Sequence, residues 1–251
     1  DGQLIKGSIE RIKDINIIPS PYLTGALDQY FQLPLIPMIE TTRGCPFTCT
    51  FCADGLAIKN KINRYETQRT REELQYIAKN INKVDELIVT DLNFGMYKQD
   101  TETAKEIANI QKNYNYPISV DAPAGKNMPK RIINIASIMK GWSMGGVIQS
   151  SDPGVLKAIK RSNISIHAYQ DLIDFGNKQK ANRTYTEIIL GLPDDTKEKH
   201  FKSLRLGIEK SVNNLRMHQA MLLIGTEMAS KKDREKYGLM TKFRTLPGNV
   251  G

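Results

Sequence analysis

A strand-like run that leads directly into three closely spaced cysteines reads MIETTRGCPFTCTFC, residues 38–52. The apolar and β-branched residues at 38–42 predict a short strand. Cys45, Cys49 and Cys52 follow with the spacing Cys-x3-Cys-x2-Cys, and the sequence contains no other cysteine. An odd number of clustered cysteines is a poor disulfide framework, and thiols kept reduced in a cytoplasm are better suited to a metal. The loop is therefore predicted to bind metal.

Three thiolates on one short loop can occupy three corners of an iron–sulfur cube. The remaining iron would have no protein ligand, and an open coordination position is typical of a catalytic metal, whereas a structural site is closed. Three alternatives remain open: structural zinc, an electron-carrying cluster with four cysteines, and chance clustering of structural thiols. Zinc would need a fourth ligand, and the three histidines, His167, His200 and His218, all lie far from the loop in sequence.

Beyond the loop, the chain alternates between strand-like and helix-like stretches. Such alternation predicts an α/β fold with a parallel sheet. Right-handed crossovers would curl six strands into a partial, open six-stranded (β/α)6 barrel of the TIM type, with the chemistry at the carboxyl ends of the strands. The predicted strands are 38–42, 86–91, 118–121, 145–149, 185–190 and 216–223. The predicted helices between them are 70–81, 101–113, 129–140, 153–160 and 196–211.

Three regions are predicted from the same pattern. Residues 1–35 are expected to be an extended linker, because prolines such as Pro19, Pro21 and Pro34 interrupt any long element. Residues 36–230 are expected to form the core, and 231–251 the start of a C-terminal extension. Both ends read as cuts in a longer protein. No apolar run approaches the ~20 residues of a membrane helix, so a cytoplasmic location and no membrane partner are expected.

The formal net charge of +9 comes from basic residues scattered along the chain. This distribution favours a solvated, lysine-rich surface over a nucleic-acid face, which would concentrate the charge. Nucleic acid is therefore not expected as a partner.

The cysteine loop resembles the signature of the radical S-adenosylmethionine (SAM) superfamily, in which an aromatic residue, here Phe51, precedes the third cysteine. The resemblance implies that Cys45, Cys49 and Cys52 hold a 4Fe-4S cluster and that SAM chelates the unique iron through its amino and carboxylate groups. It also implies that an electron from the cluster cleaves SAM to methionine and a 5′-deoxyadenosyl radical, which abstracts hydrogen from a substrate. The cofactors carry this chemistry, while the protein supplies position and electrostatics.

Polar residues after the second predicted strand resemble the family's contact with the SAM amino group. Asp91 and Asn93 are expected to accept hydrogen bonds from this amine, either through their side chains or through nearby carbonyls. The structural alternative is a turn, since Asp and Asn favour turns and Gly95 suits a bend.

Further contacts are implied after the fourth and fifth strands. Gln149 and Ser150 are expected at the ribose hydroxyls, Arg161 at the SAM carboxylate and Gly191 against adenine. The structural alternatives are a helix cap and a surface charge at a helix end. Glu187, inside the fifth strand, is a candidate proton or substrate ligand, or an ordinary solvated carboxylate. No catalytic residue is assigned.

The stretch Pro19-Ser20-Pro21-Tyr22 resembles the linker after the cobalamin-binding domain in the cobalamin-dependent branch of the superfamily. Cobalamin is thus implied for a longer parent protein, possible reactions being methylation or rearrangement of an unidentified small molecule. A methylthiotransferase-like radical SAM enzyme and a non-catalytic iron–sulfur binding module are the alternatives.

A reduced cluster needs an electron donor, and flavodoxins and ferredoxins are typically acidic. Basic residues near the cysteine loop, such as Lys59, Lys61 and Arg64, are therefore expected to steer a flavodoxin or ferredoxin toward the cluster.

Overall fold

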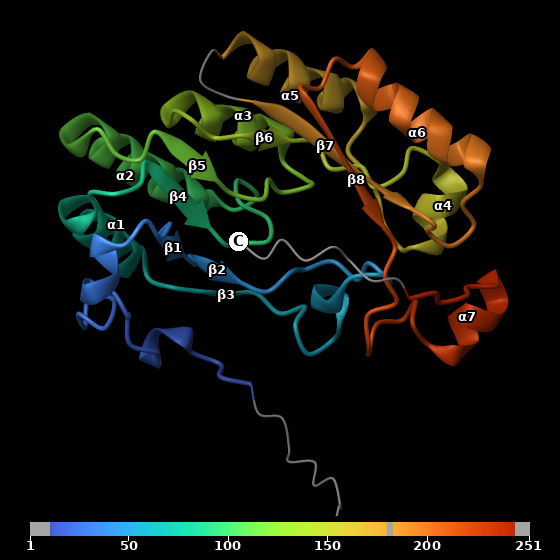
Figure 1. Ribbon diagram of the computed structural model, residues 1–251, viewed down its shortest axis with the longest axis horizontal. Helices are drawn as coiled ribbons and strands as arrows, with labels where there is room; N and C mark the ends of the chain where they lie inside the picture. The colour runs from blue at the N-terminus through green and yellow to red at the C-terminus, as the bar shows by residue number, and fades with distance from the viewer. Residues whose placement is uncertain (1–10, 180–182, 244–251) are drawn as a thin grey trace, which may run out of the picture.

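The computed structural model describes residues 11–179 and 183–243. In this part of the chain, two three-stranded parallel sheets stand side by side (Figure 1). The first sheet has the order β1-β4-β5, formed by Met38–Ile39, Glu86–Val89 and Ser119–Asp121. The second has the order β6-β7-β8, formed by Met144–Gly145, Thr184–Leu190 and Asn214–Gln219. A parallel bridge between Val120 and Trp142 links β5 to the segment leading into β6.

Helices connect the successive strands from β3 to β8, and α1, α2, α3, α5 and α6 lie on the outer side of the arch that the strands form (Figure 1). This confirms the predicted α/β fold with parallel sheets. None of the helices in the described ranges is both long and apolar enough to span a membrane. The helices are α1 (Thr67–Asn80), α2 (Lys98–Tyr114), α3 (Pro129–Ile138), α4 (Pro153–Ala158), α5 (Ile166–Lys178), α6 (Lys197–Glu209) and α7 (Lys231–Tyr237).

Each long helix buries one side against the strands. Leu74 and Ile77 on α1, and Ile132 and Ile135 on α3, are at most 1% exposed and are spaced three residues apart, so they share one helical face. The burial of each such side chain stabilises the fold by roughly 1.5–3 kcal/mol. The core therefore lies between the helices and the outer face of the sheets, which leaves the inner face free for polar residues.

The structure adds a helix that the sequence pattern missed. A single helix at 153–160 was expected between the fourth and fifth strands, but α4 ends at Ala158 and α5 follows. The Ser165 side chain caps α5 by accepting a hydrogen bond from the Ala168 N–H. α5 packs against β6 and β7, whereas Val155 of α4 packs in a separate small core with Leu192.

Three strands differ from the prediction. The strand predicted at 145–149 is the two-residue β6, which ends at Gly145. The run 38–42 divides into β1 and a second strand, β2 (Thr42–Arg43), which pairs antiparallel with β3 (Asn63–Arg64). The last strand, predicted at 216–223, is β8, which ends at Gln219. The region predicted as an extended linker contains two 3₁₀ helices, Ile15–Ile17 and Asp28–Gln32, within its described part.

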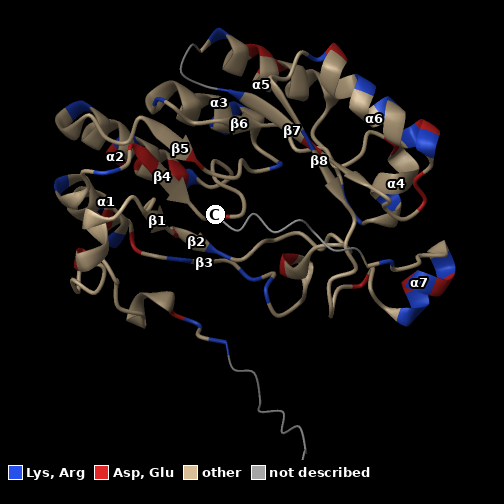
Figure 2. Ribbon diagram, viewed as in Figure 1, with Lys and Arg blue, Asp and Glu red and all other residues tan. Residues whose placement is uncertain are grey.

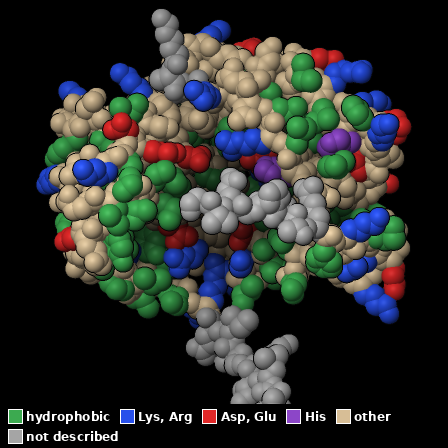
Figure 3. Space-filling model, in the orientation of Figure 1, with side chains coloured by type: hydrophobic (Ala, Val, Ile, Leu, Met, Phe, Trp, Pro, Cys, Tyr) green, Lys and Arg blue, Asp and Glu red, His purple; other side chains and the backbone are tan. Residues whose placement is uncertain are grey.

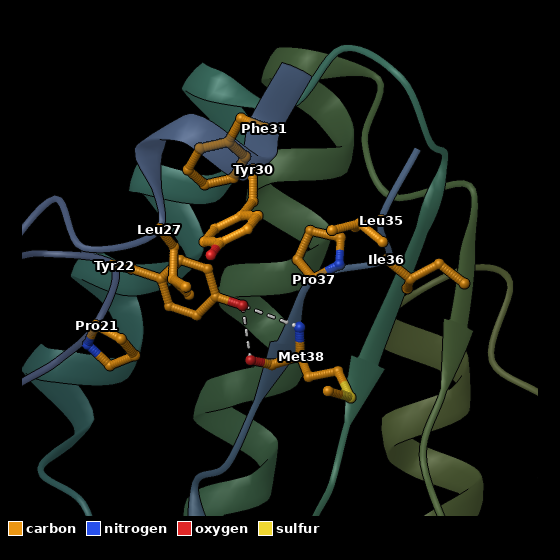
Figure 4. Close-up of a pocket in the computed structure, with 9 residues that line it drawn as sticks. All are labelled: Pro21, Tyr22, Leu27, Tyr30, Phe31, Leu35, Ile36, Pro37 and Met38. Carbon is orange, nitrogen blue, oxygen red and sulfur yellow. Dashed lines mark hydrogen bonds between the residues drawn. The ribbon is translucent and has the colours of Figure 1, made fainter. Parts of the chain in front are cut away.

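Tyr22 closes the exposed edge of β1. Its hydroxyl donates to the Met38 carbonyl at 2.8 Å and accepts from the Met38 N–H at 3.0 Å (Figure 4). These two backbone groups face away from β4, so the hydroxyl satisfies an edge that would otherwise be open to pairing with another chain. The ring borders an apolar cavity of about 450 Å³ between the N-terminal segment and β1. This cavity lies apart from the cysteines and is lined by apolar side chains and tyrosines.

Replacing Tyr22 with phenylalanine should destabilise the fold by about 0.5–1.5 kcal/mol, because the part-buried hydrogen bonds to the Met38 N–H and carbonyl are lost while the ring packing stays. Urea denaturation with linear extrapolation measures this loss. Tyr30→Phe is the matched control, since Tyr30 lines the same cavity but is 43% exposed. Equal, small losses for both variants would show that the Tyr22 hydroxyl does not secure the edge.

Candidate functional site

The three cysteines lie on the loop between β2 and β3. All three are free thiols; Cys49 is buried, and Cys45 and Cys52 are half-buried. The loop returns on itself, because the Cys45 N–H donates to the Lys59 carbonyl at 3.3 Å. Gly44 makes this possible: its φ is +102°, and a Cβ there would lie 2.2 Å from the Lys61 carbonyl oxygen.

The middle of the loop is fastened to two distant parts of the chain. The Thr50 N–H donates to the Ile159 carbonyl after α4 at 3.1 Å, and its carbonyl accepts from the Met228 N–H at 2.9 Å. Phe51 packs beside them against a small core that includes Val155 and Leu192. These contacts bring the cysteines to the carboxyl ends of β6 and β7.

Two of the cysteine sulfurs accept a hydrogen bond, and backbone N–H groups lie near the third. Asn93 Nδ2 donates to Cys45 Sγ at 3.4 Å, and Lys126 Nζ donates to Cys49 Sγ at 3.5 Å. Cys52 lies against the backbone N–H groups of Asp54 and Gly55; burial raises its pKa, and these two donors oppose the shift. Hydrogen-bond donors at Cys45 and Cys49, and backbone N–H groups near Cys52, suit thiolates, which are the form that binds iron.

The donor set fits a cluster of several metals. Three thiolates with neighbouring donors are the ligands expected for three irons of a cube. Within residues 11–179 and 183–243, no group of three His, Cys, Asp or Glu side chains is arranged around a single metal ion. A cube spaces its three thiolates on separate corners, so this arrangement is compatible with it.

Asp91 has a structural task that the sequence did not reveal. It is 2% exposed, and its carboxylate accepts from the backbone N–H groups of Thr41, at 2.7 Å, and Thr42, at 3.0 Å, and from the Thr41 hydroxyl. Burial raises its pKa, and these donors oppose the shift. The carboxylate therefore ties the end of β4 to the turn between β1 and β2. Its predicted contact with the SAM amine stays a prediction.

Gln149 and Ser150, expected together at the ribose, have different surroundings. Gln149 has a φ of +61° and is 8% exposed, and its side-chain Oε1 is buried without a hydrogen-bond partner in the described structure. An acceptor left unpaired costs free energy unless a ligand or water satisfies it. Ser150 Oγ instead accepts from the Asp152 N–H at 3.2 Å and lies 3.5 Å from Ser203 Oγ. The Ser150 hydroxyl is thus already hydrogen-bonded within the protein, whereas the Gln149 side-chain oxygen is available to accept a hydrogen bond from a ligand.

Arg161 points into the protein beside the cysteines. Its Nε donates to Asn163 Oδ1 at 3.0 Å, and Nη2 donates to the Val147 carbonyl. Burial lowers its pKa, and the neighbouring Cys49 counteracts the shift. The alternative of a solvated surface charge at a helix end is therefore wrong for Arg161.

Gly191 and Glu187 lie on and just after β7. Gly191 has a φ of +82°, and the nearest heavy atom to a Cβ placed there is 4.0 Å away. Its backbone conformation requires glycine, and the space beside it is open. Glu187 is half-buried and lies 3.5 Å from Arg216, whose guanidinium stacks over the Tyr185 ring at 4.0 Å. The Glu187 carboxylate is therefore paired with a cation and only partly exposed to solvent.

Lys126 is the site residue that the sequence interpretation missed. Its ammonium lies 3.6 Å from the centre of the Phe47 ring as well as near Cys49. Burial lowers its pKa, and the nearby Cys49 opposes the shift. Lys126 follows β5. In α/β barrels the functional residues gather after the carboxyl ends of strands, and this rule, which identified Asn93 after β4, could also have identified Lys126.

The basic residues expected to steer an electron donor have mixed surroundings. Lys59 and Lys61 are exposed beside the cysteine loop, although Lys59 also lies 3.5 Å from Asp54. Arg64 stacks over the Tyr97 ring at 4.0 Å and is half-buried. Lys and Arg occur on many sides of the chain, with no single basic block (Figure 2).

Comparison with known proteins agrees with this geometry. The model of the radical SAM superfamily matches residues 39–206, so the chain belongs to the radical SAM superfamily. The cobalamin-dependent radical SAM methyltransferase TokK of Streptomyces tokunonensis is 31% identical over 240 residues, which cover 89% of this chain and 34% of that protein. The 2-(S-pantetheinyl)-carbapenam-3-carboxylate methyltransferase of Streptantibioticus cattleyicolor is 30% identical over 245 residues, 91% of this chain and 35% of that protein.

A solved structure has the same fold. The radical SAM methyltransferase TsrM from Kitasatospora setae, with cobalamin and a [4Fe-4S] cluster bound, superposes with a TM-score of 0.69 at 15% identity. The match covers 88% of this chain and 40% of TsrM. The chain spans about a third of the length of the curated relatives it matches.

Asp100 should make stability depend on pH in a defined direction. Its carboxylate accepts from the N–H groups of Gly95, at 2.7 Å, and Tyr97, at 2.9 Å, which shapes the loop that carries Asn93. Burial raises the pKa of Asp100 to about 6. Because the pKa of Asp100 is higher in the folded than in the unfolded state, folding favours the protonated carboxyl group. The contribution of protonated Asp100 to the free energy of unfolding is therefore lost as the pH rises from about 4 through 6.

The variant Asp100→Asn keeps an acceptor oxygen but does not titrate. Relative to the wild type, its free energy of unfolding should rise by about 1–3 kcal/mol between pH 4.5 and 7.5. Urea denaturation at several pH values measures the difference, in which the other carboxylates cancel. Parallel curves for the two proteins would contradict the raised pKa.

Proposed function

We propose that this chain is the core of a cobalamin-dependent radical SAM methyltransferase, with Cys45, Cys49 and Cys52 as the ligands of a 4Fe-4S cluster. The observation that carries the proposal is the clustering of three free thiols on one loop, with hydrogen-bond donors at Cys45 and Cys49 and backbone N–H groups near Cys52. Family membership supports the use of this cluster and of SAM. The printed descriptions of TokK, the carbapenam methyltransferase and TsrM support methyl transfer and the cobalamin branch.

When bound, the cluster and SAM supply a reducing electron and a 5′-deoxyadenosyl radical. The residues of the chain bind and orient these groups. We assign the unpaired Gln149 Oε1 to a ribose hydroxyl, which would give this buried acceptor its missing donor. Arg161 has the charge to pair with the SAM carboxylate, and the open side of Gly191 suits a flat base. Asn93 and Asp91 stay assigned to the amine end, and Ser150 to the ribose.

The strands support an open six-stranded (β/α)6 barrel around this site. The six strands of the two sheets run parallel and in sequence order, and the Val120–Trp142 bridge joins the sheets. The inner face is hollowed near its centre, with charged side chains and histidine at the border (Figure 3). We propose a small-molecule substrate, with the paired Glu187 and Arg216 on the neighbouring strands β7 and β8 as its candidate contacts.

The remaining assignments follow from the same proposal. Residues 1–35 would be the linker after a cobalamin-binding domain, 36–230 the radical SAM core and 231–251 the start of a further segment; 1–10 and 244–251 lie outside the described residues. A flavodoxin or ferredoxin in the cytoplasm would supply the electron, steered by Lys59 and Lys61. A methylthiotransferase-like radical SAM enzyme stays the alternative.

Anaerobic reconstitution tests the proposal directly. The wild-type chain should bind about four irons and four sulfides, and should form 5′-deoxyadenosine from SAM with dithionite. Cys49→Ala is the blank, because two thiolates do not hold the cube. A reconstituted chain without a cluster, or with a cluster that never cleaves SAM, would refute the enzyme and leave, at most, a binding module.

The variant Gln149→Leu isolates the ribose contact. It should keep the full iron content and raise the KM for SAM about 3- to 10-fold, the worth of one neutral hydrogen bond of about 0.5–1.5 kcal/mol. Gln68→Leu, on the exposed side of α1, should change neither quantity. An unchanged KM for Gln149→Leu would remove Gln149 from the SAM site.

A further inference from the structure

Lys126 is held beside the cysteine loop by the chain's backbone. The Phe94 N–H donates to the Pro123 carbonyl at 2.9 Å, and the Gly125 N–H donates to the Phe94 carbonyl at 2.8 Å. The loop after β5 is thereby paired with the loop after β4. Gly125 allows this closeness, since a Cβ there would lie 2.8 Å from the Met96 Cβ.

Packing then directs the lysine side chain at Cys49. The ammonium lies over the Phe47 ring at 3.6 Å, which favours a cation, and 3.5 Å from Cys49 Sγ. Cys49 is the most buried of the three cysteines, so little water separates the two charges. Within the described chain, Cys49 Sγ is the hydrogen-bond acceptor found for this ammonium.

The other polar neighbours of the loop differ from Lys126. Asn93, which donates to Cys45, carries no charge. Arg161 carries a charge near Cys49, but its guanidinium already donates to the Val147 carbonyl and to Asn163. Arg161 also interacts with Cys49 but shares its guanidinium with two other acceptors, whereas the Lys126 ammonium has Cys49 Sγ as its acceptor among the described residues.

We propose that Lys126 is a positioning residue that sets the reduction potential of the cluster by holding a positive charge against the Cys49 sulfur. This inference rests on the proposed function, because it presumes the cluster. Reduction adds one negative charge to the cluster without making or breaking a bond, and a nearby cation stabilises the reduced form more than the oxidised one. Partial burial of the site strengthens this interaction. Lys126 thus makes it easier for an electron donor to reduce the cluster.

Three variants of the anaerobically reconstituted chain separate charge from shape. Lys126→Met removes the charge and keeps the length, Lys126→Arg keeps the charge, and Lys130→Met removes an exposed lysine at the start of α3. Iron and sulfide contents are measured first. The midpoint potential is then measured without SAM, by titration with dithionite followed by electron paramagnetic resonance.

At a fixed potential near the wild-type midpoint, the ratio of reduced to oxidised cluster should be about tenfold lower in Lys126→Met, which is a midpoint about 59 mV more negative for one electron. Lys126→Arg should retain most of the wild-type potential, and Lys130→Met all of it. A normal potential in Lys126→Met with full iron content would overturn the inference, as would equal shifts in Lys126→Met and Lys126→Arg. An effect confined to SAM affinity would also overturn it.

The two levels of the proposal fail differently. If the wild-type chain binds no cluster, the proposed function falls, and the role of Lys126 falls with it. If Lys126→Met loses iron, the potential of Lys126→Arg decides: a wild-type value supports the charge, and a large shift to more negative values contradicts it. Full iron and a normal potential in every variant would leave the proposed function intact and refute only the role of Lys126.

Discussion

The backbone of Thr50 is the constraint on which the site depends. Its N–H and carbonyl bond to Ile159 and Met228, which lie after α4 and after β8. A loop with three thiols and little regular structure would otherwise be free to move, and ordering each residue costs roughly 1–2 kcal/mol. Because Thr50 follows Cys49 directly, the two bonds help to hold Cys49 near Arg161 and Lys126. The hydrophobic packing of Phe51 against Val155 and Leu192 protects these bonds from water.

This placement concentrates charge in a poorly solvated region. Burial lowers the pKa of both Lys126 and Arg161, and the thiol of Cys49 counteracts the shift for each. Two cations near each other are costly unless anions lie between them. Thiolates, a cluster and the carboxylate of SAM would supply that negative charge. Bound cofactors would therefore offset the repulsion between Lys126 and Arg161, so this pair of buried cations is better suited to the cofactor-bound protein.

The features that could be predicted from the sequence are local, whereas those that could not be predicted are contacts between residues far apart in the chain. The cysteine spacing was readable because ligand geometry fixes it within a few residues, and the α/β alternation was readable because apolar periodicity is local. The partners of Asp91 and Cys49 were not readable: Thr41 is 50 residues from Asp91, and Lys126 is 77 residues from Cys49. Such contacts depend on how strands are placed side by side. The split of α4 from α5 was missed because the short polar connection before Ser165 resembles a helix end without showing that another helix begins.

Polar residues at the strand ends either hold loops in place or are available to bind cofactors, and their hydrogen bonds distinguish the two roles. Asp91 and Ser150 have acceptors that are already satisfied by neighbouring backbone N–H groups, so removing them would first disturb the loops they hold. Gln149 presents a buried oxygen with no partner among the described residues, and Lys126 directs its charge at a ligand sulfur. A protein keeps such an unsatisfied acceptor only where something else completes it. Among the strand-end groups, the unpaired oxygen of Gln149 and the sulfur-directed charge of Lys126 are therefore the two whose proposed cofactor contacts do not compete with a structural role.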